Sequence, residues 1–349
     1  MTEGARQFPC TQCGAKVEFA PGTDSLQCPY CGNQTSIPTG TVEIVENDFE
    51  STLAGMEQSA VIEDVQSVAC SSCAAHIEPP PSAEAFPCPY CGSSIVVTAK
   101  SERLIKPQAL LPFHVPRDQA TGMFRRWLTT RWFAPNALKK FARLDERLQG
   151  LYTPYWTYDA ATVSRYTGQR GDTYVVRVGK KTQTRIRWRP ASGTVSRDFD
   201  DMLVVGSTSL PRELAEKLEP WDVGSLVPYA DEYLSGFLAE RYQVDLRQGW
   251  GRAVERMEEV IRKDVERDIG GDHQRINSLD TRHSDVTYKH VLLPMWICSY
   301  RFRDKIYRFL VNARSGEVQG QRPWSAIKIA LAVIAGAAVA LAIYSASQS

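Results

Sequence analysis

The stretch CTQC at residues 10–13, followed by CPYC at residues 28–31, decides the N-terminal fold of this chain. The same pattern returns sixty residues further on, as CSSC at residues 70–73 and CPYC at residues 88–91. Paired Cys-x-x-Cys turns present four thiolates to one ion, which suits the tetrahedral coordination of Zn²⁺. Four cysteines leave no open position for water, so we expect two structural Zn²⁺ ions and no catalytic metal. The expected ligands are Cys10, Cys13, Cys28, Cys31, Cys70, Cys73, Cys88 and Cys91.

The residues between the cysteine pairs predict a zinc ribbon in each unit, and the constant offset of sixty indicates a duplication. The segments AKVEFAPGTDSLQ and AAHIEPPPSAEAF each predict two short strands around a turn. Gly14 and Gly32 follow a cysteine where the backbone needs a positive φ, whereas Ala74 stands there in the second unit. We therefore expect one less regular turn in that unit. His76 is either a swapped ligand or, as we favour, a surface histidine.

Charge divides the chain into three parts. Residues 1–100 hold 3 basic and 12 acidic residues, a net charge of −9, and residues 101–322 hold 37 basic and 28 acidic residues, a net charge of +9. Residues 1–30 lack the apolar run of a signal peptide, so we expect the bulk of the chain in the cytosol, where thiols stay reduced. Lys16 is the one Lys or Arg between the first and last cysteine of either ribbon. Nucleic-acid binding by the ribbons is therefore disfavoured, and protein recruitment is favoured.

The middle of the chain predicts a larger domain of antiparallel sheet and helix. Apolar positions at helical spacing predict a helix from about residue 117 to 132, with the stripe Ala120, Met123, Phe124, Trp127, Leu128 and Trp132. Residues 151–200 predict an antiparallel meander with turns at GD, GK and SG. A second helix is expected over 250–269, ended by two glycines, and residues 291–320 predict a strand pair.

A weaker repeat runs through this middle domain. LLPFHV at residue 110 and LYTPYW at residue 151 resemble LVPYAD at residue 226 and VLLPMW at residue 291. The fold class we expect is α+β, with the middle domain either single or duplicated at about 104–208 and 209–322. The expected boundaries are ribbon 1 at 1–38, an acidic linker at 39–66, ribbon 2 at 67–99, the α+β domain at 100–322 and a membrane helix at 324–345. The linker is either a short helix or a mobile tether.

Arginines alternate along two predicted strands. The set comprises Arg185, Arg187, Arg189, Arg301 and Arg303. Each stripe lies on one strand face, where it either contacts the phosphates of anionic lipid or nucleic acid or forms an ordinary solvated face.

Enzyme signatures are scarce. The chain has no GxxxxGK[ST], GxSxG, HExxH or GxGxxG motif. Asp198, Asp200 and Asp201 form either a cation site or, as we favour, a solvated turn, and Cys298 is expected to be a buried thiol. We expect no catalytic residues, and an enzyme with an unrecognised site stays the weakest alternative.

The C-terminal segment predicts a membrane anchor. Residues 329–344 hold no charge, and with residues 324–328 they are long enough for one span, against the alternative of a buried helix. Trp324 and Tyr344 flank the segment as interfacial aromatics, and Lys328 can snorkel. The positive-inside rule then leaves the N-terminal bulk in the cytosol, on the cytoplasmic membrane. A small-residue stripe that would permit helix packing comprises Ala332, Gly336 and Ala340.

Together with the doubled ribbon, four middle motifs resemble a known family. RWFAPN, TPYWTYDA, SRYTGQRGD and PYADEYLSGF are similar to segments of bacterial membrane-anchored proteins with transcription-factor-IIB-type zinc ribbons, often labelled primosomal protein N′ (replication factor Y)-like. The resemblance covers nearly the whole chain, although some relatives carry more than one membrane segment. It implies action with flotillin-like (SPFH) partners in membrane-organising or envelope-stress complexes, and it brings no catalytic residues.

These observations lead to three hypotheses. The first is a non-enzymatic, tail-anchored membrane adaptor whose ribbons recruit a protein, with oligomerisation left open. The second is a nucleic-acid-binding ribbon protein at the membrane, and the third is an enzyme with an unrecognised site.

Overall fold

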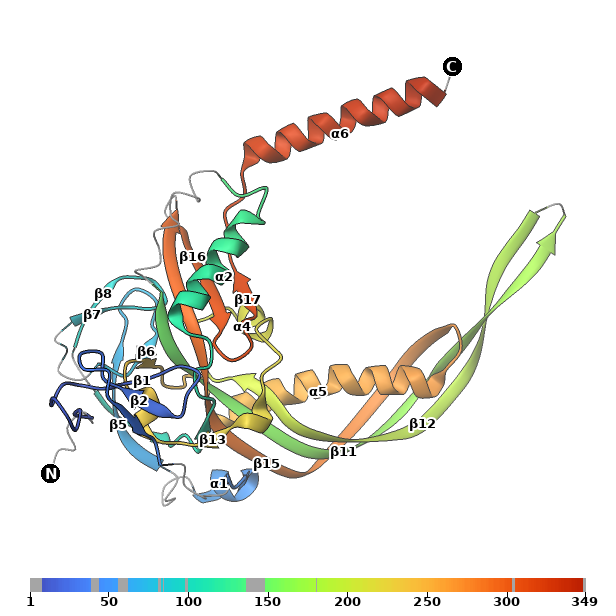
Figure 1. Cartoon of the computed structure of the whole chain (residues 1–349). Coiled ribbons are helices and arrows are strands. Elements are labelled where there is room, and N and C mark those ends of the chain that lie inside the picture. Colours follow the sequence, from blue (N-terminus) through green and yellow to red (C-terminus); the bar gives the residue numbers. More distant parts are fainter. Residues whose placement is uncertain are drawn as a thin grey trace.

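The computed structural model describes residues 8–38, 44–55, 62–80, 83, 85–97, 100–135, 148–179, 181–302 and 305–347. The fold is α+β, as predicted. Figure 1 shows a body of sheets and short helices from which two elements extend on the same side: a long curved arm of strands and the C-terminal helix α6 (Ala326–Ser347).

The central sheet is built on unusually long strands. β11 (Gln149–Val178) and β12 (Lys181–Val205) form one hairpin, and β15 (His273–Phe302) lies antiparallel to β11 on its other side. The sheet continues from β15 through β16 (Lys305–Asn312) to β17 (Val318–Gly320). The distal residues 161–198 of the hairpin and residues 273–284 of β15 form the curved arm.

The predicted meander is wrong, because one turn exists where three were expected. The hairpin turns at Gly179, whereas the GD and SG sequences lie inside strands. Gly171 is paired with Trp188, and a Cβ on Gly171 would lie 2.9 Å from atoms of Ile186 and Trp188. Glycine here makes room for the neighbouring strand's side chains rather than for a turn.

Helix α5 (Leu246–Ile269) covers the concave face of the arm (Figure 1). It begins four residues before the predicted start, because the side chain of Asp245 caps the helix by accepting a hydrogen bond from the amide of Gln248 at 2.8 Å. It ends at Gly270, which has a φ of 65°. The helix predicted over 250–269 is confirmed, and Ala253, Met257, Ile261 and Val265 on its inner side are all buried.

Helix α2 (Arg117–Thr129) packs on the other end of the sheet. The rings of Phe124 and Trp127 lie 4.3 and 5.4 Å from the ring of Phe309 on β16. The prediction that Trp132 continues this buried stripe is wrong, because the helix ends at Thr129 and the chain turns away. Trp132 is 78% exposed.

One order of elements occurs twice in the middle domain. β10 (Ala109–Leu110), α2 and the β11–β12 hairpin are followed by β13 (Val227–Pro228), α5 and the β15–β16 hairpin. The two motif pairs lie against each other, since β10 pairs with β13 and LYTPYW pairs antiparallel with VLLPMW. The boundaries predicted for two repeats stay a prediction.

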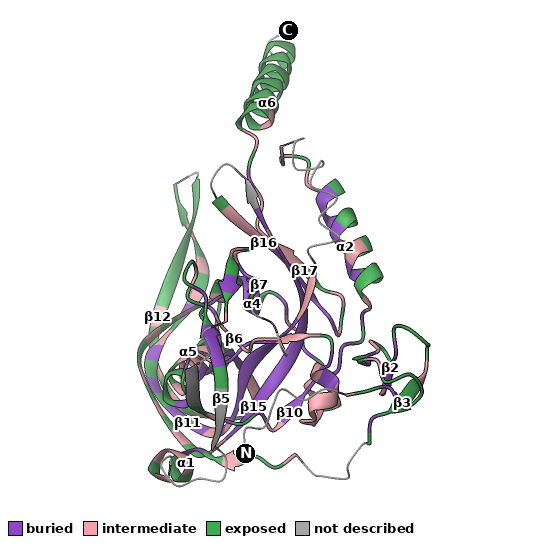
Figure 2. Cartoon of the chain, turned by 90° about the vertical axis from the view of Figure 1, so that its left-hand side faces the viewer, coloured by how far each residue is buried: buried purple, intermediate pink, exposed green. Residues whose placement is uncertain are grey.

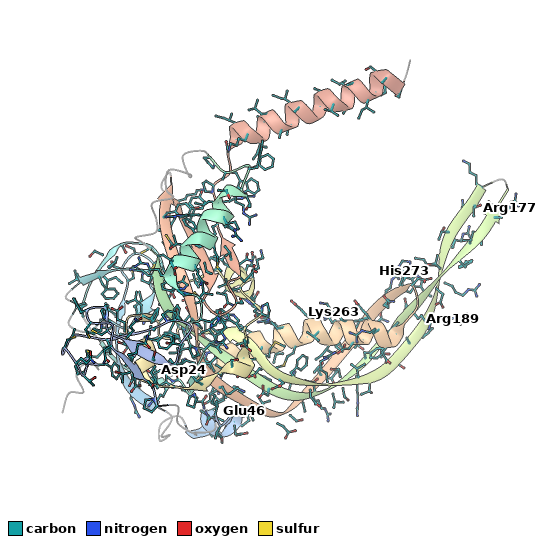
Figure 3. The ribbon with its side chains drawn as sticks, in the orientation of Figure 1. Asp24, Glu46, Arg177, Arg189, Lys263 and His273 are labelled. Carbon is teal, nitrogen blue, oxygen red and sulfur yellow. The ribbon has the colours of Figure 1, made fainter. Side chains whose placement is uncertain are left out.

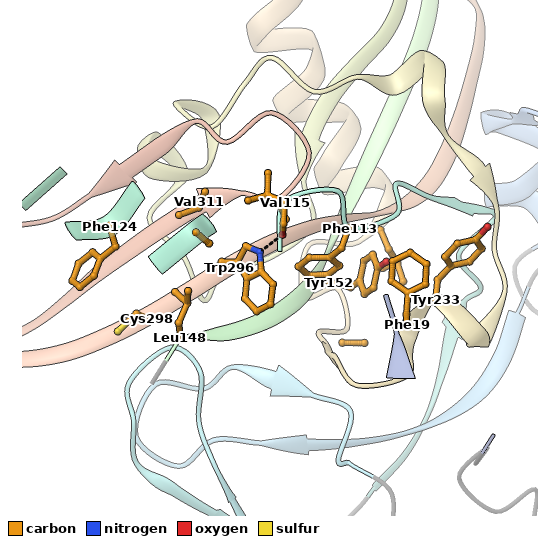
Figure 4. Packing of buried hydrophobic residues seen from close by; sticks show 14 of the residues in the cluster. Phe19, Phe113, Val115, Phe124, Leu148, Tyr152, Tyr233, Trp296, Cys298 and Val311 are labelled. Atoms are coloured by element: carbon orange, nitrogen blue, oxygen red, sulfur yellow. Dashed lines mark hydrogen bonds between the residues drawn. The ribbon is translucent and has the colours of Figure 1, made fainter. Parts of the chain in front are cut away.

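Each half of the middle domain positions the helix that belongs to the other half. Trp156 donates from Nε1 to the carbonyl of Val244 at 2.9 Å, just before α5, and Trp296 donates to the carbonyl of Val115 at 2.8 Å, just before α2 (Figure 4). Each tryptophan of one half therefore fixes the start of the helix that belongs to the other half.

The ribbons and the smaller elements surround this sheet. Ribbon 1 contains a three-stranded sheet. Between the two ribbons in the chain, residues 44–55 form a short strand and a helix. The strand pairs with β15, and the buried Phe49 of the helix lies in the same apolar cluster as Tyr288 of β15. The remaining elements are β1 (Glu18–Phe19), β2 (Ser25–Gln27), β3 (Gln34–Ser36), β4 (Asn47–Asp48), α1 (Phe49–Gly55), β5 (Ile62–Ala69), β6 (His76–Ile77), β7 (Ala85–Pro87), β8 (Ser94–Val96), β9 (Lys100–Ile105), α4 (Arg212–Glu216), η2 (Val223–Ser225), η3 (Asp231–Leu234) and β14 (Leu238–Ala239).

Buried residues concentrate where the long strands cross the body, while the end of the arm and α6 are exposed (Figure 2). One apolar cluster joins ribbon 1 to the sheet. In it, Phe113 packs edge-on against both Tyr152 and Trp296, and Phe19 of ribbon 1 packs against Tyr233 with ring centroids 5.1 Å apart (Figure 4).

Candidate metal centres and interaction surfaces

The first cysteine group forms a compact cluster. The Sγ atoms of Cys10 and Cys31 lie 3.6 Å apart, those of Cys13 and Cys28 lie 3.5 Å apart, and all four lie within 4.8 Å of one another. A tetrahedral ion with metal–sulfur bonds of about 2.3 Å would separate its sulfurs by about 3.8 Å. The amides of Cys13 and Gln12 lower the pKa of the Cys10 thiol to about 6, whereas, against the lowering effect of the Asn33 amide, burial and the neighbouring thiol of Cys10 raise the pKa of Cys31. The fit to an ion thus rests on the positions of the four sulfurs. The group can therefore hold a metal ion such as Zn²⁺.

The second group repeats this geometry. Cys70 and Cys91, and likewise Cys73 and Cys88, have Sγ–Sγ distances of 3.6 Å. Ala74 adopts a φ of 59° and donates its amide to the carbonyl of Cys70 at 2.8 Å. The expectation of a less regular turn is therefore wrong, because alanine accepts the left-handed conformation at a cost of about 1 kcal/mol. His76 lies in β6 and belongs to neither cluster.

Ribbon 2 is fixed to the body through its second Cys-x-x-Cys turn, CPYC at residues 88–91, which we call its knuckle. Tyr90, within CPYC, is fully buried and donates its hydroxyl to the carboxylate of Glu240. Ser299 on β15 donates its hydroxyl to the carbonyls of Pro89 and Tyr90, each at 2.8 Å, and Arg308 on β16 donates Nε to the Tyr90 carbonyl at 3.0 Å. The knuckle is thus held by one carboxylate, one hydroxyl and one guanidinium.

Glu240 is the centre of this attachment. Besides Tyr90, Ser207 and Ser209 donate hydroxyls to its carboxylate, and Gln243 donates its side-chain amide at 3.2 Å. Complete burial raises the pKa of Glu240 to about 7 against the lowering effect of these donors. The sequence gives no sign of Glu240, since a single glutamate in a loop carries no motif.

Ribbon 1 contacts the body through the side that lies away from its CPYC turn at residues 28–31. The hydroxyl of Ser235 donates to the carbonyl of Val17 at 2.7 Å, and the amide of Gly22 donates to the carbonyl of Phe113 at 2.9 Å. Its knuckle faces solvent: Tyr30, the counterpart of Tyr90, is 83% exposed, and Cys13 and Cys31 are exposed too. Two copies of CPYC therefore have opposite environments.

The predicted arginine stripe lies near the end of the arm. Arg185, Arg187 and Arg189 are exposed on one face of the edge strand β12, and none makes an ion pair with a residue that the structure describes. The guanidinium of Arg187 lies 5.0 Å from the ring of Tyr174. Figure 3 shows Arg177 and Arg189 on the part of the arm that extends beyond α5.

The second arginine stripe is only partly described. Arg301 belongs to β15, but its side chain and the whole of Arg303 lie outside the described residues.

An acidic cluster lies at the base of the arm. Asp200 comes close to Glu46 and Asp159, and Lys289 bridges this group by ion pairs of 2.8 Å to Glu46 and to Asp201. Burial, followed by the bond to Glu46, raises the pKa of Asp159 to about 6. The single charge of Lys289 offsets part of this negative charge, and Asp198 is exposed elsewhere on β12. Cys298 is buried, as predicted.

Helix α6 is long and apolar enough to cross a membrane, by length and composition. It has 22 residues, and none of its side chains is buried. Ala332, Gly336 and Ala340 lie on it, and a Cβ at Gly336 would meet no atom within 4 Å. Helix packing through this stripe stays a prediction.

Comparisons with known proteins give one distant relative. The chain is 24% identical over 325 residues to "Uncharacterized protein YdjG" of Bacillus subtilis (strain 168), covering 93% of this chain and 92% of that protein. No family model matches the chain, so the primosomal label has no support from that comparison, and no solved structure matches it.

Proposed function

We propose that this protein is a tail-anchored membrane adaptor in which two structural Zn²⁺ ions stabilise the ribbons and the knuckle of ribbon 1 binds a protein partner. The observation that carries the proposal is the contrast between Tyr90, buried and bonded to Glu240, and Tyr30, which is 83% exposed. An exposed aromatic residue on a rigid turn is typical of a binding surface.

Ribbon 2 indicates what such a knuckle can bind. Its tyrosine hydroxyl needs a carboxylate, and its two carbonyls take donors from a serine and an arginine. A partner of ribbon 1 would present a similar set, an acid for Tyr30 and a basic or hydroxyl donor for the carbonyls of Pro29 and Tyr30. The family resemblance makes a flotillin-like (SPFH) complex the candidate partner.

The lining of an open groove between the two ribbons supports a non-enzymatic role. Phe19, Phe86 and Phe237 line it, and its ionisable lining groups are Glu18 and Arg117. That pair offers neither a nucleophile nor an acid–base pair matched for catalysis near neutral pH.

Anchoring by α6 supports a location on the cytoplasmic membrane with the ribbons in the cytosol. Basic residues precede the helix and no charge follows Lys328. This orientation is the one that the positive-inside rule favours.

The test is crosslinking in membranes, followed by purification and mass spectrometry. Wild-type protein should yield a defined partner, Tyr30→Ala should lose it, and both should keep two zinc ions per chain. Gln27→Ala, on an exposed position of β2 in the same ribbon, serves as the matched control. An unchanged set of partners for Tyr30→Ala would refute the knuckle as the binding surface.

A second candidate function rests on the arm. Arg185, Arg187 and Arg189 lack acidic partners among the described residues, and Arg275 stacks on Trp188 at 4.0 Å. Such a row of exposed arginines suits binding to the phosphates of lipid or nucleic acid. Lipid is favoured because the arm and α6 extend from the body on the same side (Figure 1). A charged edge strand that blocks aggregation is the alternative.

A further inference from the structure

Two tryptophans near the start of α6 differ from the other six. Trp132 is 78% exposed and Trp324 is 60% exposed. The remaining tryptophans are buried or half-buried. Exposing an indole to water is unfavourable, so two exposed indoles next to an apolar helix call for a shared explanation.

The loop after α2 is bonded directly to the first turn of α6. Lys328 donates its ammonium to the carbonyls of Trp132 at 3.0 Å and Ala134 at 2.8 Å, and the amide of Ser325 donates to the carbonyl of Phe133 at 2.8 Å. The rings of Phe133 and Trp324 lie 6.4 Å apart. We call residues 131–135 and 322–328 together the collar. In Figures 1 and 2 the end of α2 lies beside the start of α6.

These contacts set the depth of the collar relative to α6. A helix of 22 residues is about 33 Å long, close to the roughly 30 Å of a bilayer's hydrocarbon core. The third residue of α6, Lys328, must then lie at the boundary between headgroups and hydrocarbon. Since its ammonium binds the carbonyls of Trp132 and Ala134, those residues are held at the same depth.

Two guanidiniums complete the collar. Arg131 stacks on Trp127 at 5.0 Å with its buried Nε unbonded, and Arg322 stacks on Trp324 at 4.4 Å. Neither makes an ion pair with a described residue. Because the amide of Ser325 bonds to the carbonyl of Phe133, the segments that carry Arg131 and Arg322 lie against each other, and burial, followed by the positive charge of Arg131, lowers the pKa of Arg322. An anion placed between the two cations would be attracted to both.

We propose that the collar is a lipid-binding seat, in which Trp132 inserts at the headgroup–hydrocarbon boundary and Arg131 and Arg322 bind the phosphate of a phospholipid headgroup. Tryptophan is enriched at this boundary because its ring is apolar and its N–H is polar. The soluble domain is thus held against the bilayer at a second point beside α6. The inference rests on the proposed spanning by α6 and is independent of any partner of ribbon 1.

The test is depth-dependent quenching of tryptophan fluorescence in the full chain, reconstituted into phosphatidylcholine vesicles that carry bromine at shallow or deep acyl positions. The share of each tryptophan is the difference in emission between wild type and Trp132→Phe, Trp324→Phe or Trp221→Phe. Trp221 is buried in the body and its Nε1 makes no hydrogen bond among the described residues, so it is the control residue. We expect shallow bromine to remove most of the Trp132 and Trp324 emission while the Trp221 emission persists.

The outcomes separate the collar from the anchor. Quenching of Trp324 without quenching of Trp132 would overturn the collar and leave the anchor intact. Quenching of neither residue would overturn both.

The phosphate site has its own measurement. Crosslinking of a photoactivatable phosphatidylglycerol to the collar peptides of the full chain, mapped by mass spectrometry, should fall several-fold in Arg131→Gln/Arg322→Gln, and free inorganic phosphate in excess should not compete if the site requires a lipid. The matched variant Arg125→Gln/Arg126→Gln, on the exposed face of α2, should crosslink like the wild type. Equal crosslinking of wild type and the collar variant would refute the site, and competition by phosphate would reassign it to free anions.

Discussion

Replacing Glu240 by glutamine should change how stability depends on pH. The pKa of Glu240 is about 7 in the folded chain and about 4.5 when unfolded. Because the folded value is the higher one, the native state holds the proton more tightly. Protonation of Glu240 therefore stabilises the native state, and this contribution is fully present below about pH 4.5. It is lost progressively as pH rises through 7, and the loss between pH 5.5 and pH 8 amounts to about 2 kcal/mol.

Glu240→Gln removes this titration while keeping an oxygen that can accept bonds from the hydroxyls of Ser207 and Ser209. Thermal unfolding of the detergent-solubilised chain, compared between variant and wild type at each pH, isolates the contribution of Glu240, because the zinc sites are common to both. Between pH 5.5 and pH 8 the wild type should lose about 2 kcal/mol of unfolding free energy that the variant does not lose.

The control for this experiment is Glu78→Gln, which removes a half-exposed carboxylate that pairs with Arg241 at 3.1 Å in the same junction. Glu78→Gln removes a negative charge from the same junction without touching the bonds to the Glu240 carboxylate, so a pH-dependent change that both variants share does not come from Glu240. If Glu240→Gln differs from wild type by a constant amount, burial does not raise the pKa of Glu240, and the attachment of Tyr90 needs another explanation.

Three further predictions concern the ribbons and the arm. Elemental analysis should find two zinc per chain, one in Cys28→Ser and two in Cys298→Ser; retention of both in Cys28→Ser would contradict the four-cysteine site of ribbon 1. Ala74→Gly should stabilise ribbon 2 by about 1 kcal/mol, since glycine adopts a φ of 59° without strain, and an unchanged melting temperature would argue against strain there. Arg185→Ala/Arg187→Ala should weaken low-salt binding to phosphatidylglycerol vesicles relative to phosphatidylcholine, whereas an effect confined to nucleic acid would contradict lipid binding by the arm and favour nucleic-acid binding.

Local spacing predicted the parts of the fold that local chemistry determines. The cysteine pattern identified both metal groups because four thiols at fixed intervals admit one arrangement, and the two glycines after residue 269 identified the end of α5. The strands were misjudged because Gly171 and Gly193 look like turn residues, yet they serve close packing between long strands. Trp132 was misplaced for a similar reason: periodicity cannot show where a helix ends when the final side chain is apolar.

The sequence could not predict that Tyr30 is exposed and Tyr90 buried, because the two residues stand in identical CPYC motifs. What separates them is Glu240, which lies 150 residues from Tyr90 and reaches it only through the fold. The same limit applies to the collar, where Lys328 meets Trp132 across 196 residues. Long-range partners of this kind are set by the tertiary fold, and no local motif reveals them.

The packing also affects how an adaptor of this kind would act. One continuous apolar cluster contains Phe19 of ribbon 1, Phe113 and Trp296 of the sheet, and Phe124 and Ala134 at α2 and the collar. Because densely packed side chains transmit position, ribbon 1 is fixed relative to the base of α6 rather than free on a tether. A partner bound at Tyr30 would therefore be held at a constant distance and orientation from the bilayer. Loosening this cluster, for example by Phe113→Ala, should cost about 3–5 kcal/mol in stability and weaken partner capture even though the knuckle itself is unchanged.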